Sequence, residues 1–311
     1  MFVRAAARAF DASGDEAPEG PPGAPAPWTD RRSPDRPQFV EGWRKAVRRK
    51  VAQAQAMTPT SVEASGRVDI WIANPDVLMR AQSSLKLLSE EDWTLVTRIQ
   101  DPVRRRAAVA SRVILRIALS RAAEHKVAAA DWRFALSASG KPVVASGLPP
   151  LHFSVSHLDQ LVVVAVSADR EIGVDVECID QNISPEVIAG FTHIDEQHSV
   201  GGLPRPQEIR EFVRLWTLKE AYTKLVGAGL SLDFKTINFT LDPVDLTSVG
   251  TNGTKQNGTT QFENFYISNK HMLFHASLAI RHPPDDLGTT EVQIISLTNG
   301  RSNHAAAPLT R

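Results

Sequence analysis

Two carboxylates stand two residues apart in the stretch from Gly173 to Glu177, which reads Gly-Val-Asp-Val-Glu. The alternation is that of a strand, so the side chains of Asp175 and Glu177 project from one face and that of Cys178 from the other. Like charges at this spacing repel, and either the pKa of one carboxyl rises or a cation binds between the two. The pair by itself favours a plainer interpretation, the solvated face of a half-buried strand.

A third carboxylate, Glu220, falls in a stretch with helical periodicity. The apolar stripe of this stretch has i, i+3, i+4, i+7 spacing and consists of Ile209, Phe212, Val213 and Trp216. Glu220 follows on the same stripe at i+11, and a buried carboxylate needs a partner. Lys224, four residues on, offers an ion pair as one possibility. The other is a divalent cation shared with Asp175 and Glu177, and such an all-oxygen set suits Mg²⁺ or Mn²⁺.

Strands and helices must position these carboxylates, and the sequence predicts both. A helix over 207–226 carries Glu220 and is followed by Gly227, a common C-cap residue. Strands are expected at 68–72, 131–136, 153–157, 161–166, 172–179, 236–241, 264–268, 274–280 and 292–297. Helices and hairpins interleave, which indicates the α+β class.

Two further helices are expected upstream. The longer one follows Pro102 and has Val109, Val113 and Ile117 on one face. The shorter one begins after Ser89, which has an acidic residue three positions on, as in a capping box. The segment between Cys178 and about 202 has no clear periodicity.

Composition narrows the classes of function. The chain of 311 residues is 42% hydrophobic and 23% charged, enough for one large core or two smaller ones. Thirty-five basic residues balance thirty-five acidic ones, so we expect neither a nucleic acid nor a membrane as partner, and a charged partner must meet a local patch. No apolar run approaches the roughly 20 residues of a transmembrane helix. The single cysteine, Cys178, excludes an intramolecular disulfide and favours the cytoplasm.

The N-terminal segment has the composition of an unfolded chain. Residues 11–38 are rich in Pro, Gly, Ala, Asp and Glu, and we expect residues 1–66 to form a disordered extension. Regular alternation begins only at Val68, so Met57 stays an alternative start. Arginines among alanines at the N-terminus are followed at once by acidic residues, and no targeting peptide is expected. Two Asn-Gly-Thr sequences, at 252 and 257, are interpreted as turns.

Four motifs, in order and at fitting spacing, resemble those of the Sfp-type 4'-phosphopantetheinyl transferases. They are Gly140-Lys141-Pro142, Phe153-Ser-Val-Ser156-His157, Gly173-Val-Asp175-Val-Glu177 and Trp216-Thr-Leu-Lys219-Glu220-Ala-Tyr-Thr-Lys224-Leu-Val-Gly-Ala-Gly-Leu230. The resemblance covers roughly residues 68–282. It implies a pseudo-twofold pair of similar α/β subdomains with coenzyme A bound between them, although the sequence contains no internal repeat.

The resemblance also implies domain boundaries. The N-terminal subdomain would cover 67–168, the C-terminal subdomain with the metal site 169–282, and a C-terminal strand and tail 283–311. The long chain with motifs in two halves is similar to the monomeric, broad-specificity branch of the family. Which carrier protein is served, in fatty acid, polyketide or nonribosomal peptide synthesis, stays open.

The activity implied by the resemblance is transfer of the 4'-phosphopantetheine arm of coenzyme A to a serine of an apo acyl or peptidyl carrier protein. Asp175, Glu177 and Glu220 would hold Mg²⁺ against the diphosphate, and 3',5'-adenosine bisphosphate would leave. Glu220 is the best candidate for the base that takes the serine proton, directly or through water. Asp175 and Lys224 complete the predicted catalytic set.

Contacts to coenzyme A are carried over residue by residue. Ser156 and His157 would meet phosphate, and Lys219 and Lys224 would reach the diphosphate. Lys141, in a rigid turn, suits the adenine or 3'-phosphate end, and an ordinary hairpin tip is its alternative.

A cluster of arginines between residues 104 and 116 is similar in placement to a basic helix that the family uses for the 3'-phosphate and the acidic carrier. Arg98 and Arg104 are the expected contacts for the 3'-phosphate and an acidic carrier, whereas most other arginines of this region, Arg105, Arg106, Arg112 and Arg116, are interpreted as the wet face of an amphipathic helix.

The sequence departs from the family pattern in places. Ser154 and Leu158 replace an expected asparagine and serine, which removes a phosphate-side hydrogen bond from the expected set. The acid expected in the middle segment is either Asp195 or Glu196.

Two other classes of function compete with this interpretation. A coenzyme A-binding module without turnover would keep the cleft, but the intact carboxylate trio argues against it. Another metal-dependent phosphoryl-transfer enzyme is the second, and the chain lacks the Gly-x-x-x-x-Gly-Lys-Ser/Thr motif of the P-loop type.

Overall fold

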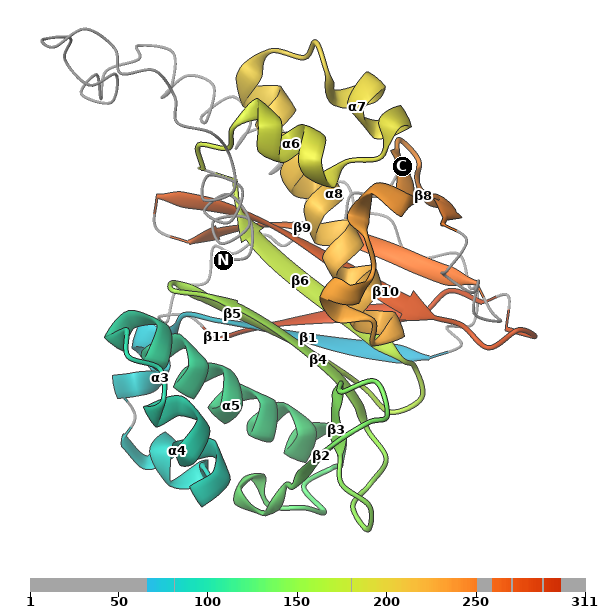
Figure 1. Cartoon of the computed structure of the whole chain (residues 1–311). Coiled ribbons are helices and arrows are strands. Elements are labelled where there is room, and N and C mark those ends of the chain that lie inside the picture. Colours follow the sequence, from blue (N-terminus) through green and yellow to red (C-terminus); the bar gives the residue numbers. More distant parts are fainter. Residues whose placement is uncertain are drawn as a thin grey trace, which may run out of the picture. The chain divides into compact units, whose positions relative to one another are not determined.

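Two sheets, each covered by one long helix, organise the part of the chain that can be described. The computed structural model describes residues 66–297 apart from 81, 180, 251–258, 270 and 287. These residues belong to one compact unit, 61–311 (Figure 1). The predicted extension, the alternative start at Met57 and the two Asn-Gly-Thr sequences lie outside the described residues.

The first sheet has the strand order β11-β1-β5-β4. Its strands are β1 (Arg67–Ala73), β4 (His152–Leu158), β5 (Leu161–Ser167) and β11 (Glu291–Leu297). β5 pairs antiparallel with both β1 and β4, whereas β11 pairs parallel with β1. The C-terminal strand therefore completes the sheet that the N-terminal strand begins.

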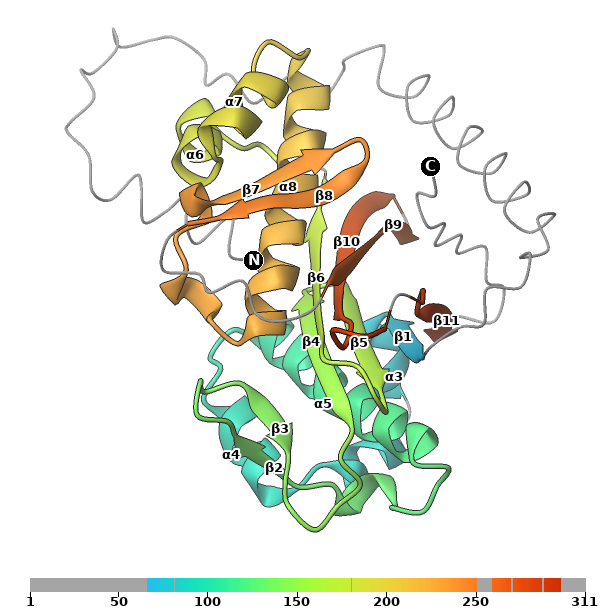
Figure 2. The ribbon, with the colours of Figure 1, turned by 90° about the vertical axis from the view of Figure 1, so that its right-hand side faces the viewer.

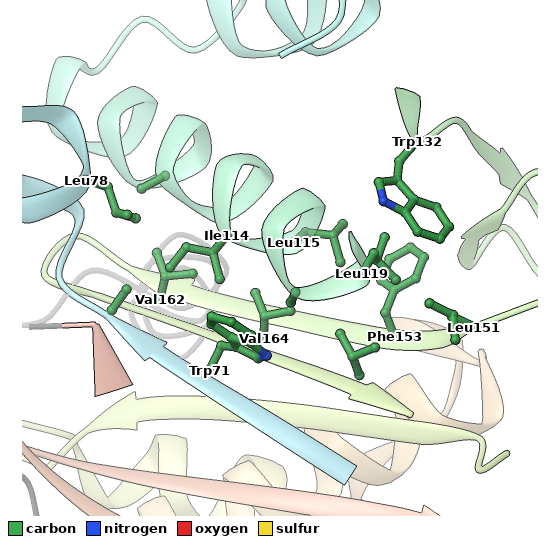
Figure 3. Packing of buried hydrophobic residues seen from close by; sticks show 14 of the residues in the cluster. Trp71, Leu78, Ile114, Leu115, Leu119, Trp132, Leu151, Phe153, Val162 and Val164 are labelled. Atoms are coloured by element: carbon green, nitrogen blue, oxygen red, sulfur yellow. The ribbon is translucent and has the colours of Figure 1, made fainter. Parts of the chain in front are cut away.

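Helix α5 (Pro102–Ala122) covers this sheet and forms its core. Pro102 stands at the first turn, and the side chain of Asp101 accepts from the backbone N–H groups of Val103 and Arg104, which fixes where the helix begins. Figure 3 shows Ile114, Leu115 and Leu119 of α5 facing the sheet, where Val162 and Val164 of β5 lie. Each such buried side chain contributes roughly 1.5–3 kcal/mol.

Short elements surround α5. They are α3 (Pro75–Arg80), η1 (Gln82–Leu87), α4 (Glu90–Thr97), η2 (Ala129–Asp131) and the hairpin of β2 (Phe134–Leu136) and β3 (Pro142–Val144). The capping box of Ser89 and Asp92 is confirmed at the start of α4. The strand predicted over 131–136 is shorter and begins at Phe134, because Asp131 belongs to the 3₁₀ helix η2.

The second sheet has the order β6-β10-β9 and is antiparallel throughout. Its strands are β6 (Ile172–Cys178), β9 (Thr260–Asn269) and β10 (Met272–Arg281). Helix α8 (Arg205–Val226) crosses this sheet (Figures 1 and 2). It ends at Gly227, whose φ of 73° is the left-handed conformation that glycine adopts without strain.

Gly173 lets α8 approach β6 closely. A Cβ at this position would lie 2.0 Å from the carbonyl oxygen of Ala221 and 2.5 Å from the nitrogen of Leu225, both backbone atoms of the helix. Only glycine fits here, and because side chains alternate along β6, the same face carries Asp175 and Glu177.

The segment without clear periodicity folds into α6 (Pro185–Phe191) and α7 (Ile194–Val200), which lie near the N-terminal half of α8 (Figure 1). A hairpin of β7 (Ile237–Leu241) and β8 (Val244–Val249) follows the 3₁₀ turns η3 (Gly229–Ser231) and η4 (Phe234–Thr236). The sequence predicts β7 but not β8.

The two halves meet where β4 lies against β6. The backbone N–H of Val174 donates to the hydroxyl of Ser154 at 2.9 Å, so Ser154, which replaces the expected asparagine, links the two strands.

The α+β class predicted from the sequence is confirmed. No helix among the described residues is long and apolar enough to cross a membrane.

Candidate active site

Asp175 and Glu177 are buried on the face of β6 that meets α8. Their exposed fractions are only 5% and 4%, so the solvated-strand interpretation of this pair is wrong. Two carboxylates that are both out of water and on the same face disfavour each other's charge. Burial, and next the charge of Asp175, raise the pKa of Glu177.

One oxygen of Asp175 has two partners and the other has none. The ammonium of Lys224 donates to Oδ1 at 2.6 Å, and the hydroxyl of Ser156 donates to the same atom at 2.8 Å. Oδ2 is buried without a hydrogen-bond partner among the described residues. A carboxylate oxygen in that position costs free energy until a donor or a cation meets it.

Glu220 is 7% exposed, and its Oε1 is likewise buried without a partner in the described part of the chain. Burial, followed by the charge of Asp175, raises the pKa of Glu220 to about 7, and the charge of Lys224 opposes that rise. A carboxyl with a pKa near neutrality changes its protonation state easily, which is what a general base requires.

Lys224 bridges the helix and the strand. Its ammonium donates to the backbone oxygen of Val174 at 3.1 Å as well as to Asp175, and its side chain is 28% exposed. The predicted ion pair within the helix, from Lys224 to Glu220, is therefore replaced by one from Lys224 to Asp175. Lys224 is the only one of the two lysines in this motif that reaches the carboxylates.

The carboxylate chemistry fits a hard cation, although the side chains do not form a ready-made site. Two buried carboxylate oxygens, Oδ2 of Asp175 and Oε1 of Glu220, lack partners, and oxygen ligands are those that Mg²⁺ prefers. Over residues 66–297, with the gaps given above, no three His, Cys, Asp or Glu side chains are arranged closely enough to hold an ion. Binding of a cation would require these side chains to rearrange.

His157 lies at the end of β4 near two cations. Burial, and then the charges of Lys224 and Arg112, lower the pKa of His157 to about 4, so its ring is neutral at neutral pH. Ser156, its neighbour on the strand, is 9% exposed and points to Asp175. β4, β6 and α8 thus bring Ser156 to the carboxylates, and Lys224 lies near enough to His157 for its charge to act on the ring.

Lys141 lies where the β2–β3 hairpin of the first half meets the start of β6 and the end of α8. Its ammonium donates to the carbonyl oxygens of Ile172 at 3.1 Å and Leu225 at 3.4 Å, at the start of β6 and the end of α8. Burial lowers the pKa of Lys141. A cavity of about 390 Å³ opens beside it, with Ser139, His152 and Arg281 among its lining residues.

Lys219 does not reach the carboxylates, contrary to the predicted phosphate contact. Its exposed fraction is 0%, and its ammonium donates to Glu196 at 2.5 Å and to the backbone oxygens of Phe191 and Phe234. An ammonium has three N–H donors, and all three are used. Lys219 therefore holds α7 and η4 against α8.

The same contacts distinguish the two candidate acids of the middle segment. Glu196 is 1% exposed and also accepts from the backbone N–H of Phe239 at 2.9 Å. Asp195 is exposed and accepts from the side chain of Asn238. Glu196 is thus the buried partner of the motif lysine.

The arginines of the first half divide into two groups. Arg98 caps the exposed end of α4, and the guanidinium of Arg104 is 47% exposed beside Asp101. Arg116, by contrast, is 1% exposed and its guanidinium pairs with Asp92 at 2.5 Å. The interpretation of Arg116 as part of a wet helix face is wrong, because it lies one turn after Val113 on the buried side.

Arg112 belongs with neither group. It shares Asp92 with Arg116, at 3.4 Å, but its side chain keeps 26% exposure. Its charge acts on His157, as described above.

Sequence reasoning missed a buried polar row on β10. His275 and Ser277 are both 0% exposed and pair in register with Glu177 and Asp175. Burial, then the charge of Arg214, lowers the pKa of His275 to about 3. The available signal was the alternation of His275 and Ser277 with Phe274, Ala276 and Leu278 in a predicted strand.

Comparisons with known proteins point to one family. A family model described as "4'-phosphopantetheinyl transferase superfamily" matches residues 171–278, which contain β6, α8 and all three carboxylates. Relatives named as 4'-phosphopantetheinyl transferases include HetI of Nostoc sp. (strain PCC 7120), which is 28% identical over 58% of this chain and 77% of its own length.

Two more relatives match different extents of the chain. Sfp of Bacillus subtilis (strain 168) is 32% identical over 39% of this chain and 51% of its own length. A protein of Xenopus laevis named L-aminoadipate-semialdehyde dehydrogenase-phosphopantetheinyl transferase is 25% identical over 68% of this chain and 80% of its own length.

Proposed function

Because the chain belongs to the 4'-phosphopantetheinyl transferase superfamily, we propose that it transfers the 4'-phosphopantetheine arm of coenzyme A to a serine of an apo carrier protein. The observation that carries the proposal is the burial of Asp175, Glu177 and Glu220 on β6 and α8, where that burial and the charges of the first two raise the pKa of the third, inside the stretch that matches the superfamily. The products are the holo carrier and 3',5'-adenosine bisphosphate.

The reaction is proposed to depend on magnesium held by these three carboxylates, with Mn²⁺ as an alternative. The buried, unpartnered oxygens of Asp175 and Glu220 support this proposal. When bound, the cation supplies charge neutralisation at the diphosphate of coenzyme A.

Glu220 is proposed to take the proton of the carrier serine. The serine oxygen attacks the phosphorus that bears the pantetheine arm, and the bond from this phosphorus to the oxygen of the adenosine bisphosphate breaks. A base with a pKa of about 7 accepts the serine proton readily at neutral pH. Asp175 is proposed to act with it by keeping Lys224 in place.

The neighbouring cationic and neutral donors are proposed to hold the phosphates. The Lys224 ammonium is partly exposed and next to the carboxylates, so it can meet a diphosphate oxygen. His157, neutral in the ligand-free chain, gains a proton favourably when a phosphate dianion approaches. Ser156 holds Asp175 and supports these contacts from β4.

The finer properties of the protein are proposals of the same kind. Action in the cytoplasm fits the single cysteine, Cys178, whose buried thiol a reducing compartment preserves, and action as a monomer is what the two-half layout of the motifs implies. The exposed guanidinium of Arg104 fits an acidic carrier surface.

The test is mass spectrometry of carrier domains. Incubation of an apo carrier with coenzyme A, Mg²⁺ and the protein should add one phosphopantetheine mass, and chelation of the metal should stop the addition. A panel of apo carriers from fatty acid, polyketide and nonribosomal peptide synthesis identifies the acceptor. No addition to any of them, with Mg²⁺ or Mn²⁺ present, would refute the proposed function.

A further inference from the structure

A buried hydrogen-bond network lies beside the carboxylates on the same face of the second sheet. In an antiparallel pair, residues directly opposite each other project to the same side. His275 is opposite Glu177, and Ser277 is opposite Asp175. One strand farther out, Asn264 is opposite Ser277. The three strands therefore present a continuous polar row toward α8.

Thr217 of α8 meets this row from above. Its hydroxyl lies 2.8 Å from Nδ1 of His275 and 2.8 Å from the hydroxyl of Ser277. Ser277 in turn donates to the side-chain oxygen of Asn264 at 2.9 Å. Thr217, His275 and Ser277 are each 0% exposed, so no water competes for these bonds.

The network lies one helical turn from Glu220. Residues three apart on a helix share a face, so the rotation of α8 that places Thr217 over β10 also places Glu220 over β6. Apolar side chains around Thr217, such as Val213 and Trp216, pack without strong directionality. Hydrogen bonds to two particular partners, by contrast, select one rotation and one height of the helix.

A second polar tether lies on the other side of Glu220. Lys224, four residues on, binds Val174 and Asp175 of β6. These hydrogen bonds are partly exposed and use the same ammonium that is proposed to contact phosphate, so they change when a ligand binds. The hydrogen bonds of Thr217 are fully buried in the core and do not change on binding.

We propose that Thr217, His275 and Ser277 are positioning residues that fix the setting of Glu220 relative to Asp175. The inference rests on the proposed function for its catalytic consequence only. Its structural part concerns the position of the Glu220 carboxylate relative to that of Asp175. This position does not depend on whether a carrier protein is present.

The test uses variants that remove hydrogen-bonding atoms and little volume. Thr217→Val deletes the hydroxyl, and Thr217→Ser restores it. His275→Leu deletes the ring nitrogens, and His275→Asn restores a polar atom near the position of Nδ1. The matched control is Thr223→Val, because Thr223 is also 0% exposed on α8, but its hydroxyl bonds only to the carbonyl oxygen of Glu220 within the helix, at 3.0 Å.

Two measurements are made on each full-length variant. The first is kcat and KM for coenzyme A with the carrier identified above. Thr217→Val and His275→Leu should lower kcat about tenfold to a hundredfold with little change in KM, as expected for a misplaced catalytic group. Thr217→Ser and His275→Asn should recover most of kcat, and Thr223→Val should resemble the wild type.

The second measurement is the separation of the Asp175 and Glu220 carboxylates in crystal structures of the wild type, Thr217→Val and Thr223→Val. The separation should change in Thr217→Val and not in Thr223→Val. An unchanged separation, or wild-type kcat in Thr217→Val, would overturn the proposal. Because the crystal structures need no turnover, an inactive wild type would refute the proposed function and leave the positioning role decided by the separation.

Discussion

The ammonium of Lys224 lies 2.6 Å from Oδ1 of Asp175 and joins the end of α8 to the middle of β6. Asp175 is the more buried partner of this ion pair, with a side chain that is 7% exposed. Removing one partner of such a pair leaves a charge without compensation, which costs more than the pair itself contributes. Lys224 also opposes the rise in the pKa of Glu220, so its charge acts on two carboxylates at once.

Replacement of Lys224 by Gln should therefore lower kcat/KM for coenzyme A on the order of a hundredfold, a loss typical of one preorganised electrostatic contact. Steady-state kinetics with an apo carrier measure it. Lys224→Arg, which keeps the charge, is the matched control and should retain more activity. Equal activity of Lys224→Gln and the wild type would show that this ammonium has no role in turnover.

Glu220→Gln should abolish transfer and change how stability depends on pH. The folded-state pKa of Glu220 is about 7, above the ordinary value of 4.5. Its contribution to stability is therefore fully present below pH 4.5 and is lost as the pH rises through 7. Without metal, the Tm of Glu220→Gln should exceed that of the wild type more at about pH 8 than at about pH 5.

Added Mg²⁺ should reduce this difference at the higher pH, because a cation stabilises the charged carboxylate that only the wild type has. Thermal unfolding followed by circular dichroism measures both effects. A Tm difference that does not depend on pH would contradict the assignment of the raised pKa to Glu220, and an effect of Mg²⁺ that is equal in both proteins would contradict the metal site.

The protonation of His157 should respond to coenzyme A. Burial and the nearby cations Lys224 and Arg112 hold the pKa of His157 at about 4 in the ligand-free chain. A phosphate anion in contact with the ring favours the charged form, so binding should raise the pKa. NMR titration of ring carbon-bound protons measures it, and the signal missing from His157→Gln identifies the residue. No change on saturation with coenzyme A would place the phosphates elsewhere.

Much of this arrangement was predictable because the decisive elements are long and periodic. The stripe that contains Trp216 and Glu220 spans three turns, and the alternation around Asp175 spans a whole strand. These patterns predicted α8, β6 and their shared carboxylates without any long-range information. The helices α6 and α7 have seven residues each, too few for a periodicity to stand out.

The errors of prediction concern charged residues whose partners are distant in sequence. Lys219 is enclosed by Glu196, 23 residues earlier, and Arg116 by Asp92, 24 residues earlier. The local sequence around a lysine or arginine does not show whether its side chain faces a ligand or a buried carboxylate. Only the fold decides between the two, because it alone determines which acid comes within reach.

Gly173→Ala should destabilise the chain and lower activity. The new Cβ would lie 2.0 Å from a backbone oxygen of α8, which cannot move without shifting the helix that carries Glu220. Gly147→Ala is the comparison, since its Cβ would meet nothing within 4 Å and only the backbone strain at φ 86° remains, about 1–2 kcal/mol. Urea unfolding should therefore show a larger loss for Gly173→Ala, and equal losses would mean that the helix adapts.

Carrier binding should weaken as salt is added. The guanidinium of Arg104 is 47% exposed at the start of α5, and an attraction between exposed charges is screened within about 8 Å at physiological ionic strength. The Kd of an acidic apo carrier, measured by fluorescence anisotropy, should rise with NaCl concentration, and Arg104→Ala should weaken this dependence.

Arg133→Ala is the matched control, because Arg133 is also exposed but donates to the backbone oxygens of Ala130 and Trp132, beyond the other end of α5. Its salt dependence should equal that of the wild type. If Arg133→Ala weakens binding and Arg104→Ala does not, the carrier meets the hairpin end of the first half, because the charge that steers association must lie near the surface that is buried.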